Sequence, residues 1–319
     1  MELFYTMSDI LSKCKEYKSL KIDKNKKINI DILRSYTCEF LEKSLFVEGV
    51  ESNFNIQTQF GDFNQYFQEV LDNNSWFYKN NSDVILLTVN IEDYYPNLIK
   101  ESLQNELTDK IISNIVKTFS NLIGELVENT KSIVMFTSFS MLFLVPNFNY
   151  NKHSMHGLEK IISNINRELI NAFATDSRVF FLDTNDIIAK VGYFNYYDLK
   201  MLSYAKNPYT TNYYTLLSRQ IISILNIIHK PKKKCIIVDL DNTLWGGIVG
   251  EDGYEKVKLD FYYKKIQEIL LLYKETGILL AINSKNNFED VEELFTKNNE
   301  MILKFDDFAV KKKLEPKIC

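Results

Sequence analysis

Between about residues 26 and 226 the chain alternates short apolar, β-branched runs with longer amphipathic stretches, and this alternation constrains the fold most strongly. The pattern is typical of repeated βαβ units. Runs that are apolar almost throughout indicate strands covered on both faces by helices. We therefore expect an α/β domain with a parallel sheet whose strands lie at 28–33, 54–58, 84–89, 132–137 and 179–182.

Two amphipathic stretches in this region are long enough to be helices. In the stretch 158–173 apolar residues recur at spacings of three and four, which predicts one buried stripe made of Leu158, Ile161, Ile162, Ile165, Leu169, Ile170 and Phe173. The stretch 214–228 is followed by a basic segment interrupted by Pro231, which a helix cannot continue. We therefore predict a first domain at 1–229, a basic linker at 230–234 and a second domain at 235–319.

Composition and charge argue against several classes of function. Basic residues number 38 against 42 acidic ones, so the chain offers no broad basic face for nucleic acid. The apolar runs are far shorter than the roughly 18 residues needed to cross a bilayer, and no secretion signal is visible, so we expect a cytoplasmic protein without a membrane partner. Neither a zinc cluster nor a disulfide framework is expected, because wide spacing separates the cysteines Cys14, Cys38, Cys235 and Cys319.

Residues suited to catalysis are concentrated where the second domain begins. An apolar strand that starts at Cys235 leads directly into Asp239 and Asp241. Ligands of open α/β sheets bind beyond the carboxyl ends of the strands, so both carboxylates can face such a site. One carboxylate there can attack phosphorus and form an aspartyl-phosphate, while the other protonates the leaving oxygen and later activates water. An acidic pair that merely caps a turn is the alternative for so short a motif.

The residues that follow support a phosphate site. Two acids beside a phosphate require a cation, and Mg²⁺ with oxygen ligands meets that need. Four of the ten glycines lie between residues 246 and 253, which indicates a tight hairpin flap. A helix at 261–275 and a strand at 278–282 follow, and Ser284 at the end of that strand can bind phosphate oxygens. Asn286 or Asn287 can cap the next helix, at 288–295.

Residues 239–253 read Asp-Leu-Asp-Asn-Thr-Leu-Trp-Gly-Gly-Ile-Val-Gly-Glu-Asp-Gly, and this segment resembles the first motif of the FkbH-like family. That family is subfamily IIIC of the haloacid dehalogenase (HAD) superfamily. Residues 282–287 resemble its second motif. Residues 307–310, followed by 315–317, resemble the approach to its third motif, whose lysine would be Lys317, although the usual asparagine–tryptophan pair is absent.

The resemblance implies a HAD-type phosphatase. Asp239 would be the nucleophile and Asp241 the acid and base, both would bind Mg²⁺, and phosphate would be held by Thr243, Ser284 and Lys317. In the family the whole protein is implicated in taking a glyceryl unit from 1,3-bisphosphoglycerate, removing phosphate and loading the acyl group onto an acyl carrier protein. The implied partners are therefore a phosphorylated small molecule and an acyl carrier protein.

The resemblance also covers the first domain, because FkbH-like proteins have an N-terminal domain similar to SGNH hydrolases. Ser35, Gly61 and Asp198 lie where landmarks of that domain fall, and Asn90 is a weaker candidate. An SGNH esterase needs a serine activated by histidine. No Asp-x-x-His arrangement exists, because the only histidines are His153, His156 and His229. We expect this domain to bind a carrier protein or the acyl portion of the substrate.

The implied architecture is an SGNH-like or flavodoxin-like parallel-sheet domain followed by a partial HAD-like, Rossmannoid domain. A complete HAD site has a fourth, acidic motif after a further strand, and the chain ends at Cys319 before it. The pair Asp306 and Asp307 comes too early to replace it. We therefore expect weak metal binding, an impaired catalyst and an exposed sheet edge. The alternatives are a non-catalytic relative that binds a carrier protein, and an esterase or acyltransferase that uses Ser35.

Overall fold

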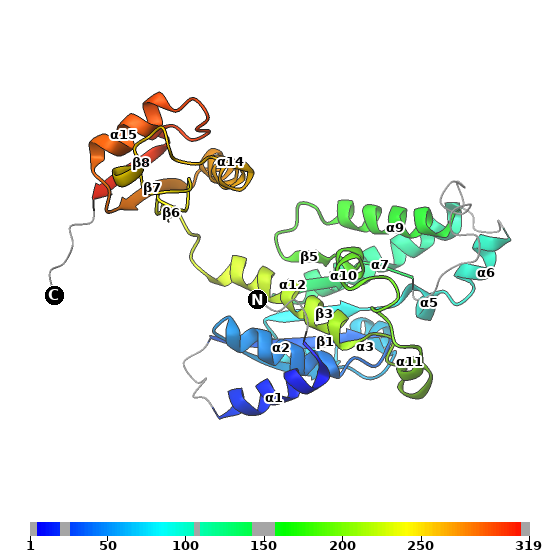
Figure 1. Ribbon diagram of the computed structural model, residues 1–319. Helices are drawn as coiled ribbons and strands as arrows, with labels where there is room; N and C mark the ends of the chain where they lie inside the picture. The colour runs from blue at the N-terminus through cyan, green and yellow to red at the C-terminus, as the bar shows by residue number, and fades with distance from the viewer. Residues whose placement is uncertain (1–4, 20–25, 105–108, 142–156, 314–319) are drawn as a thin grey trace. The chain divides into compact units, whose positions relative to one another are not determined.

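The computed structural model describes residues 5–19, 26–104, 109–141 and 157–313. The chain divides into two compact units, Met1–His229 and Lys230–Cys319 (Figure 1). Each unit is an α/β structure built on a parallel sheet, which confirms the predicted fold class. Within the part of the chain that is described, no helix has both the length and the apolar character needed to span a membrane.

The first unit contains a five-stranded sheet in the order β2-β1-β3-β4-β5, with every neighbouring pair parallel. Its strands are β1 (Lys26–Arg34), β2 (Phe54–Phe60), β3 (Val84–Thr88), β4 (Ile133–Thr137) and β5 (Val179–Leu182). All five predicted strands are confirmed, with ends displaced by at most two residues. The chain order reverses between β1 and β3, and such a reversal opens a crevice at the carboxyl ends of the strands.

Helices cover both faces of this sheet (Figure 1). One face packs against α2 (Phe40–Glu51), α10 (Thr184–Val191) and α12 (Thr211–His229), and α1 (Met7–Lys18) lies against α2. The other face packs against α3 (Tyr66–Leu71), α4 (Trp76–Asn80), α7 (Asp109–Asn129) and α9 (Leu158–Ala172). Short helices connect these elements, namely α5 (Ile91–Tyr94), α6 (Leu98–Leu103) and α11 (Leu199–Ala205).

The core follows the alternation of side chains along the strands. On β3, Val84 and Leu86 pack toward α2 and α12, whereas Ile85 and Leu87 pack toward α7 and α9. Both sets are fully buried, as expected for a central parallel strand. In α9 the predicted stripe is buried as far as Leu169, but Ile170 is exposed. It follows Leu169 by one residue and is therefore turned about 100° around the helix.

The second unit has three parallel strands in the order β6-β7-β8, which are β6 (Cys235–Val238), β7 (Leu279–Ser284) and β8 (Phe308–Lys313). Between them lie α13 (Val249–Asp252), α14 (Phe261–Glu275), α15 (Phe288–Lys297) and the 3₁₀ helix η2 (Phe305–Asp307). Helices α14 and α15 share one core with the sheet, formed by Val238, Leu240, Leu270, Leu280, Ile282, Val291, Leu294 and Phe308. The apolar side chains of Ile237, Leu279 and Val310 are exposed.

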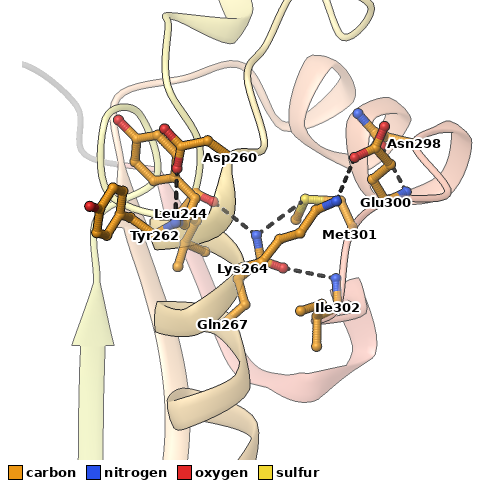
Figure 2. A network of polar contacts seen from close by, with 10 residues as sticks. Leu244, Asp260, Tyr262, Lys264, Gln267, Asn298, Glu300, Met301 and Ile302 are labelled. Carbon is orange, nitrogen blue, oxygen red and sulfur yellow. Dashed lines mark hydrogen bonds and ion pairs between the residues drawn. The ribbon is translucent and has the colours of Figure 1, made fainter.

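Gln267 of α14 joins three segments of the second unit through a fully buried side chain (Figure 2). Its Nε2 donates to the Leu244 carbonyl at 2.8 Å, and its Oε1 accepts the backbone N–H groups of Ile302 and Leu303 at 2.9 and 3.1 Å. The side chain of Lys264, one turn earlier, makes a surface ion pair with Glu300 and no further polar contact with the described residues. Gln267 therefore fixes the loop that follows Asp241 against the helix.

Replacing Gln267 with Met keeps the volume but leaves one carbonyl and two N–H groups without their partner. We expect the second unit to lose at least about 3 kcal/mol of stability, because each of the three polar groups buried without a partner costs about 1–3 kcal/mol. Lys264→Met is the matched control and should cost less than about 1 kcal/mol, as for a surface ion pair. Urea unfolding followed by Trp245 fluorescence in a Trp76→Phe background measures both, and equal losses would contradict the role given to Gln267.

Candidate functional site

Asp239 lies just beyond the carboxyl end of β6, and Ser284 closes the neighbouring strand β7. The register pairs Val238 with Ile282, so the loops that follow the two strands leave the same edge of the sheet. The Asp239 side chain is exposed, and no hydrogen bond to it is found among the described residues. This carboxylate is therefore available to a ligand from solvent.

Asp241, in contrast, is held at both carboxylate oxygens. Its Oδ1 accepts the Trp245 indole Nε1–H at 3.0 Å and the Val249 backbone N–H at 3.2 Å. Its Oδ2 accepts the amide Nδ2–H of Asn286 at 2.8 Å. The three donors come from the loop after β6, from α13 and from the loop after β7. Asp241 is thus half-buried and oriented, while Asp239 is exposed and unengaged.

The glycine-rich segment folds into a short flap beside the acidic pair. Gly246 and Lys258 exchange two backbone hydrogen bonds of 2.8 Å as an antiparallel bridge. A side chain at position 246 would crowd the Tyr263 ring, since its Cβ would lie 3.1 Å from a ring carbon. Asn242 has a positive φ of 56° and accepts the Gly247 N–H through its side chain at 3.1 Å. These contacts explain why the turn after Asp241 needs small and amide residues.

The predicted phosphate-binding residues are distributed unevenly. Ser284 is buried at the end of β7, where its Oγ accepts the Asn286 backbone N–H at 3.2 Å. Its own hydroxyl hydrogen has no acceptor among the residues that the structure describes. Thr243 is half-buried and continues the turn through a bond from its N–H to the Leu240 carbonyl. Lys317 lies outside the described residues.

Asp307 has a structural role. Its Oδ1 pairs with Lys274 at 2.5 Å, and its Oδ2 accepts the Lys304 backbone N–H at 2.6 Å. Both oxygens thus fix the start of β8. Asp306 lies beside it in η2.

The carboxylates of Asp239 and Asp241 differ in how well they suit a Mg²⁺ ion. No group of three or more His, Cys, Asp or Glu side chains that could hold a metal ion occurs in the part of the chain that is described. Mg²⁺ keeps several waters and is bound in proteins through one or two carboxylates together with substrate phosphate. Asp239 fits that mode because its oxygens are unengaged. Both oxygens of Asp241 already accept N–H bonds.

A second polar cluster lies in the first unit, where β1 and β3 end. Ser35 Oγ donates to Asp93 Oδ2 at 2.7 Å and accepts the Asn90 backbone N–H at 3.0 Å. Asn90 Nδ2 also donates to Asp93 at 3.2 Å, and its Oδ1 accepts the Tyr209 hydroxyl at 2.7 Å. Ser35 and Asn90 therefore meet at the reversal of strand order. Asp93, which the sequence did not single out, joins them.

Gly61 has a different role from this cluster. Its N–H donates to the Ile32 carbonyl at 2.9 Å, and its own carbonyl accepts Arg34 Nε at 3.2 Å. A side chain at this position would collide with the Glu69 carboxylate. The glycine thus allows a close approach after β2, and its bond reaches the residue that precedes Ser35.

The first unit does not bring His229 to Ser35. His229 bonds to Lys26 through Nδ1 at 2.7 Å, at the start of β1, whereas Ser35 follows the end of that strand. Nine residues of strand separate the two ends by about 30 Å. His153 and His156 lie outside the described residues. Asp198 is the N-cap of α11 and accepts the Met201 N–H, so a methionine stands where an Asp-x-x-His arrangement would have its histidine.

The sequence and structure together define a class of protein: a flavodoxin-like parallel α/β unit followed by a second parallel α/β unit with an acidic pair at the end of its first strand. No protein-family model matches the chain, and no curated protein matches it. Among solved structures it is similar to the N-terminal part of BF1531 from Bacteroides fragilis, which contains a phosphatase domain complexed with Mg. The TM-score is 0.78 at 23% identity, over 97% of this chain and 81% of that chain.

Two further similarities are weaker. The lipase Lip_vut3 from a goat rumen metagenome gives a TM-score of 0.44 at 16% identity, over 62% of this chain and 97% of that chain. The acetyl xylan esterase AlAXEase gives 0.40 at 13% identity, over 61% of this chain and 98% of that chain. Both TM-scores lie below 0.5, so these two similarities carry no argument about the fold. The identity of 23% to BF1531 supports the fold and no more.

The Asp93 carboxyl group is perturbed by its surroundings. Residue Asp93 as a whole is exposed, but desolvation around the carboxyl group outweighs the hydrogen bonds from Ser35 and Asn90 and raises its pKa. The folded protein therefore holds this proton to a higher pH than the unfolded chain, whose Asp pKa is about 3.9. Stability from this group is present in full below the unfolded pKa and is lost as pH rises through the folded pKa.

Replacing Asp93 with Asn removes the ionisation and keeps an acceptor for Ser35. We expect the stability of Asp93→Asn relative to the parent to rise as pH increases from about 4, and to level off once the parent's carboxyl group is ionised. Urea unfolding of the whole chain at several pH values measures this difference. A difference that stays constant over that range would contradict the assigned direction of the pKa shift.

Proposed function

We propose that the second unit transfers a phosphoryl group from a phosphorylated small molecule to Asp239 and then to water. The observation that carries this proposal is the contrast within one acidic pair. Asp239 is exposed at the end of β6 and accepts no hydrogen bond from the described residues, while Asp241, two positions later, is held at both oxygens. A nucleophile must reach substrate, whereas an acid and base must be held in one orientation.

The proposed chemistry runs in two steps. In the first, an oxygen of Asp239 forms a bond to phosphorus as the bond to the leaving oxygen breaks, and Asp241 gives that oxygen its proton. In the second, Asp241 takes a proton from water, which attacks the aspartyl-phosphate and frees inorganic phosphate and Asp239. Ser284 donates its hydroxyl hydrogen to a phosphate oxygen. When bound at Asp239, Mg²⁺ supplies positive charge that offsets repulsion between carboxylate and phosphate.

The substrate and partner follow from the resemblance to FkbH-like proteins. The proposed substrate is 1,3-bisphosphoglycerate, and the proposed acceptor of the glyceryl unit is an acyl carrier protein. A thiol of the carrier would form its bond to the acyl carbon as the acyl phosphate leaves as inorganic phosphate, while Asp239 would take the phosphoryl group of the phosphate ester. The size of the flap is compatible with this proposal. Only residues 247–257 lie between the paired Gly246 and Lys258, so no large cap stands over the acidic pair at this point. A substrate delivered by a bulky partner needs such access.

The alternative that uses Ser35 as an esterase nucleophile has less support. Ser35 is 2% exposed, and its hydroxyl hydrogen is already donated to Asp93. A serine nucleophile must reach a carbonyl carbon from an open site. The contacts of Ser35 instead join the ends of β1 and β3, which fits a supporting role for the first unit.

Incubation of the whole chain with acetyl phosphate and Mg²⁺ tests the proposed reaction. We expect phosphate release and a hydroxylamine-sensitive adduct on Asp239. Asp239→Asn should abolish both because it removes the nucleophile. Ser284→Ala should lower the rate about 10-fold, as expected for loss of one hydrogen bond worth about 1.4 kcal/mol to a charged group.

Glu275→Gln, which alters an exposed acid at the far end of α14, is the control and should leave the rate unchanged. If the unaltered chain releases no phosphate and forms no adduct, the non-catalytic alternative is favoured. Activity on an activated acetyl ester that Ser35→Ala removes and Asp239→Asn retains would favour the esterase alternative.

A further inference from the structure

Asn286 occupies the loop between β7 and α15, and it contacts both proposed catalytic elements. Its side-chain Nδ2 lies 2.8 Å from Asp241 Oδ2, and its backbone N lies 3.2 Å from Ser284 Oγ. These two contacts leave the same residue in different directions. One reaches the loop after β6 and the other turns back to the end of β7.

The side-chain contact determines which group of the Asn286 amide faces Asp241. A carboxylate has only acceptor sites, so the Asn286 group that faces Asp241 must be its NH₂ and not its carbonyl oxygen. Trp245 Nε1 and the Val249 N–H already hold Oδ1 of the same carboxylate. With Oδ2 held by Asn286, the carboxylate is restrained at both oxygens and cannot rotate about its Cβ–Cγ bond without breaking a hydrogen bond.

The backbone contact fixes Ser284. Because the Asn286 N–H donates to Ser284 Oγ, that oxygen acts as an acceptor on the loop side. Its hydroxyl hydrogen must then point elsewhere, and within the described ranges it has no acceptor, so it can be donated to a phosphate oxygen. The backbone of Asn286 thus orients a donor to phosphate while its side chain orients the proposed acid and base.

Helix capping does not account for Asn286. The N-cap of α15 is Asn287, and it makes no side-chain capping bond. The first turn of α15 carries Glu289 and Asp290, which suit the positive end of the helix dipole without an asparagine cap. The amide of Asn286 is directed instead to Asp241, which lies 45 residues earlier in the chain.

We propose that Asn286 is a positioning residue that couples Asp241 to Ser284 and so sets the acid and base against the bound phosphate. This inference rests on the proposed phosphoryl transfer. Asn286 itself touches no reacting atom. Loss of its amide frees Oδ2 of Asp241 to leave the orientation in which it meets the leaving oxygen, whereas the backbone N–H to Ser284 survives any substitution except proline.

The dependence of the rate on the leaving group distinguishes positioning from general damage. A poor leaving group needs a well-placed acid, and a good one needs it much less. Asn286→Ala should therefore lower kcat by about 10- to 100-fold on phenyl phosphate but by less than about threefold on acetyl phosphate. The larger loss is smaller than the roughly 10²–10⁴-fold contribution of acid catalysis, because Asp241 itself remains. Asn286→Gln, which keeps an amide, should recover part of the loss. An equal fall on both substrates would overturn the proposal.

Asn298→Ala is the matched control. This residue lies at the opposite end of α15, where its side chain accepts the Glu300 N–H at 2.9 Å. The same change of amide to methyl there should leave the ratio of the two rates as it is in the unaltered chain. A similar change of ratio in both variants would also overturn the proposal, because the effect would then belong to the fold of the unit.

Trp245 supplies a measurement that does not depend on activity. Its indole N–H is bound to the same carboxylate that Asn286 holds, so release of Oδ2 should shift its emission in a Trp76→Phe background. We expect the shift in Asn286→Ala and not in Asn298→Ala. If the unaltered chain hydrolyses neither substrate, the proposed function fails. In that case an emission shift in Asn286→Ala still supports the coupling between Asn286 and Asp241. An unchanged emission overturns the proposed coupling.

Discussion

The parallel pairing of β6 with β7 is the constraint on which the candidate site depends. Because Val238 lies opposite Ile282, the chain leaves both strands at one edge of the sheet, and residues 239–241 come to lie beside residues 284–286. A slip of one residue would turn every side chain of β6 to the other face. It would also carry the acidic pair away from Ser284. The buried alternation of Ile236 and Val238 against Leu280 and Ile282 therefore sets the geometry of the site as well as the core.

The carboxylates of Asp239 and Asp241, which only one residue separates in the sequence, have different surroundings. Asp241 accepts three N–H bonds and is half-buried, whereas Asp239 is exposed without a protein donor among the described residues. Hydrogen-bond donors hold an acid in place, and their absence leaves the other carboxylate free to exchange water for a ligand. The flap helps to create this asymmetry, because Val249 belongs to it and Trp245 directly precedes it. Gln267 in turn holds the Leu244 carbonyl, so the buried network of Figure 2 supports the same loop.

Both units have polar residues at the carboxyl ends of neighbouring strands, but the two clusters differ in how many of their donors and acceptors are paired. In the first unit Ser35, Asn90 and Asp93 satisfy one another, and Tyr209 completes the set. In the described part of the second unit, Asp239 and the hydroxyl hydrogen of Ser284 have no hydrogen-bond partner. A network whose donors and acceptors are already matched gives rigidity, whereas unmatched groups at a strand end can bind a ligand. This contrast supports assigning chemistry to the second unit and a structural or binding role to the first.

The local sequence pattern predicted those features that depend on residues close together in the chain. The five strands of the first unit and the bounds of α14 follow from alternation and periodicity, and Ser284 was expected at the end of its strand. The partners of Asp241 and Ser35 depend on contacts across 45 and 58 residues, which no spacing in the sequence encodes. Asn286 shows the limit most clearly. Beside a helix start, an asparagine is expected to cap through its side-chain oxygen, and only the β6–β7 pairing reveals that the Asn286 amide N–H donates to a carboxylate instead. Asn287 takes the N-cap position, while the side-chain Nδ2–H of Asn286 donates a charge-assisted hydrogen bond to Asp241.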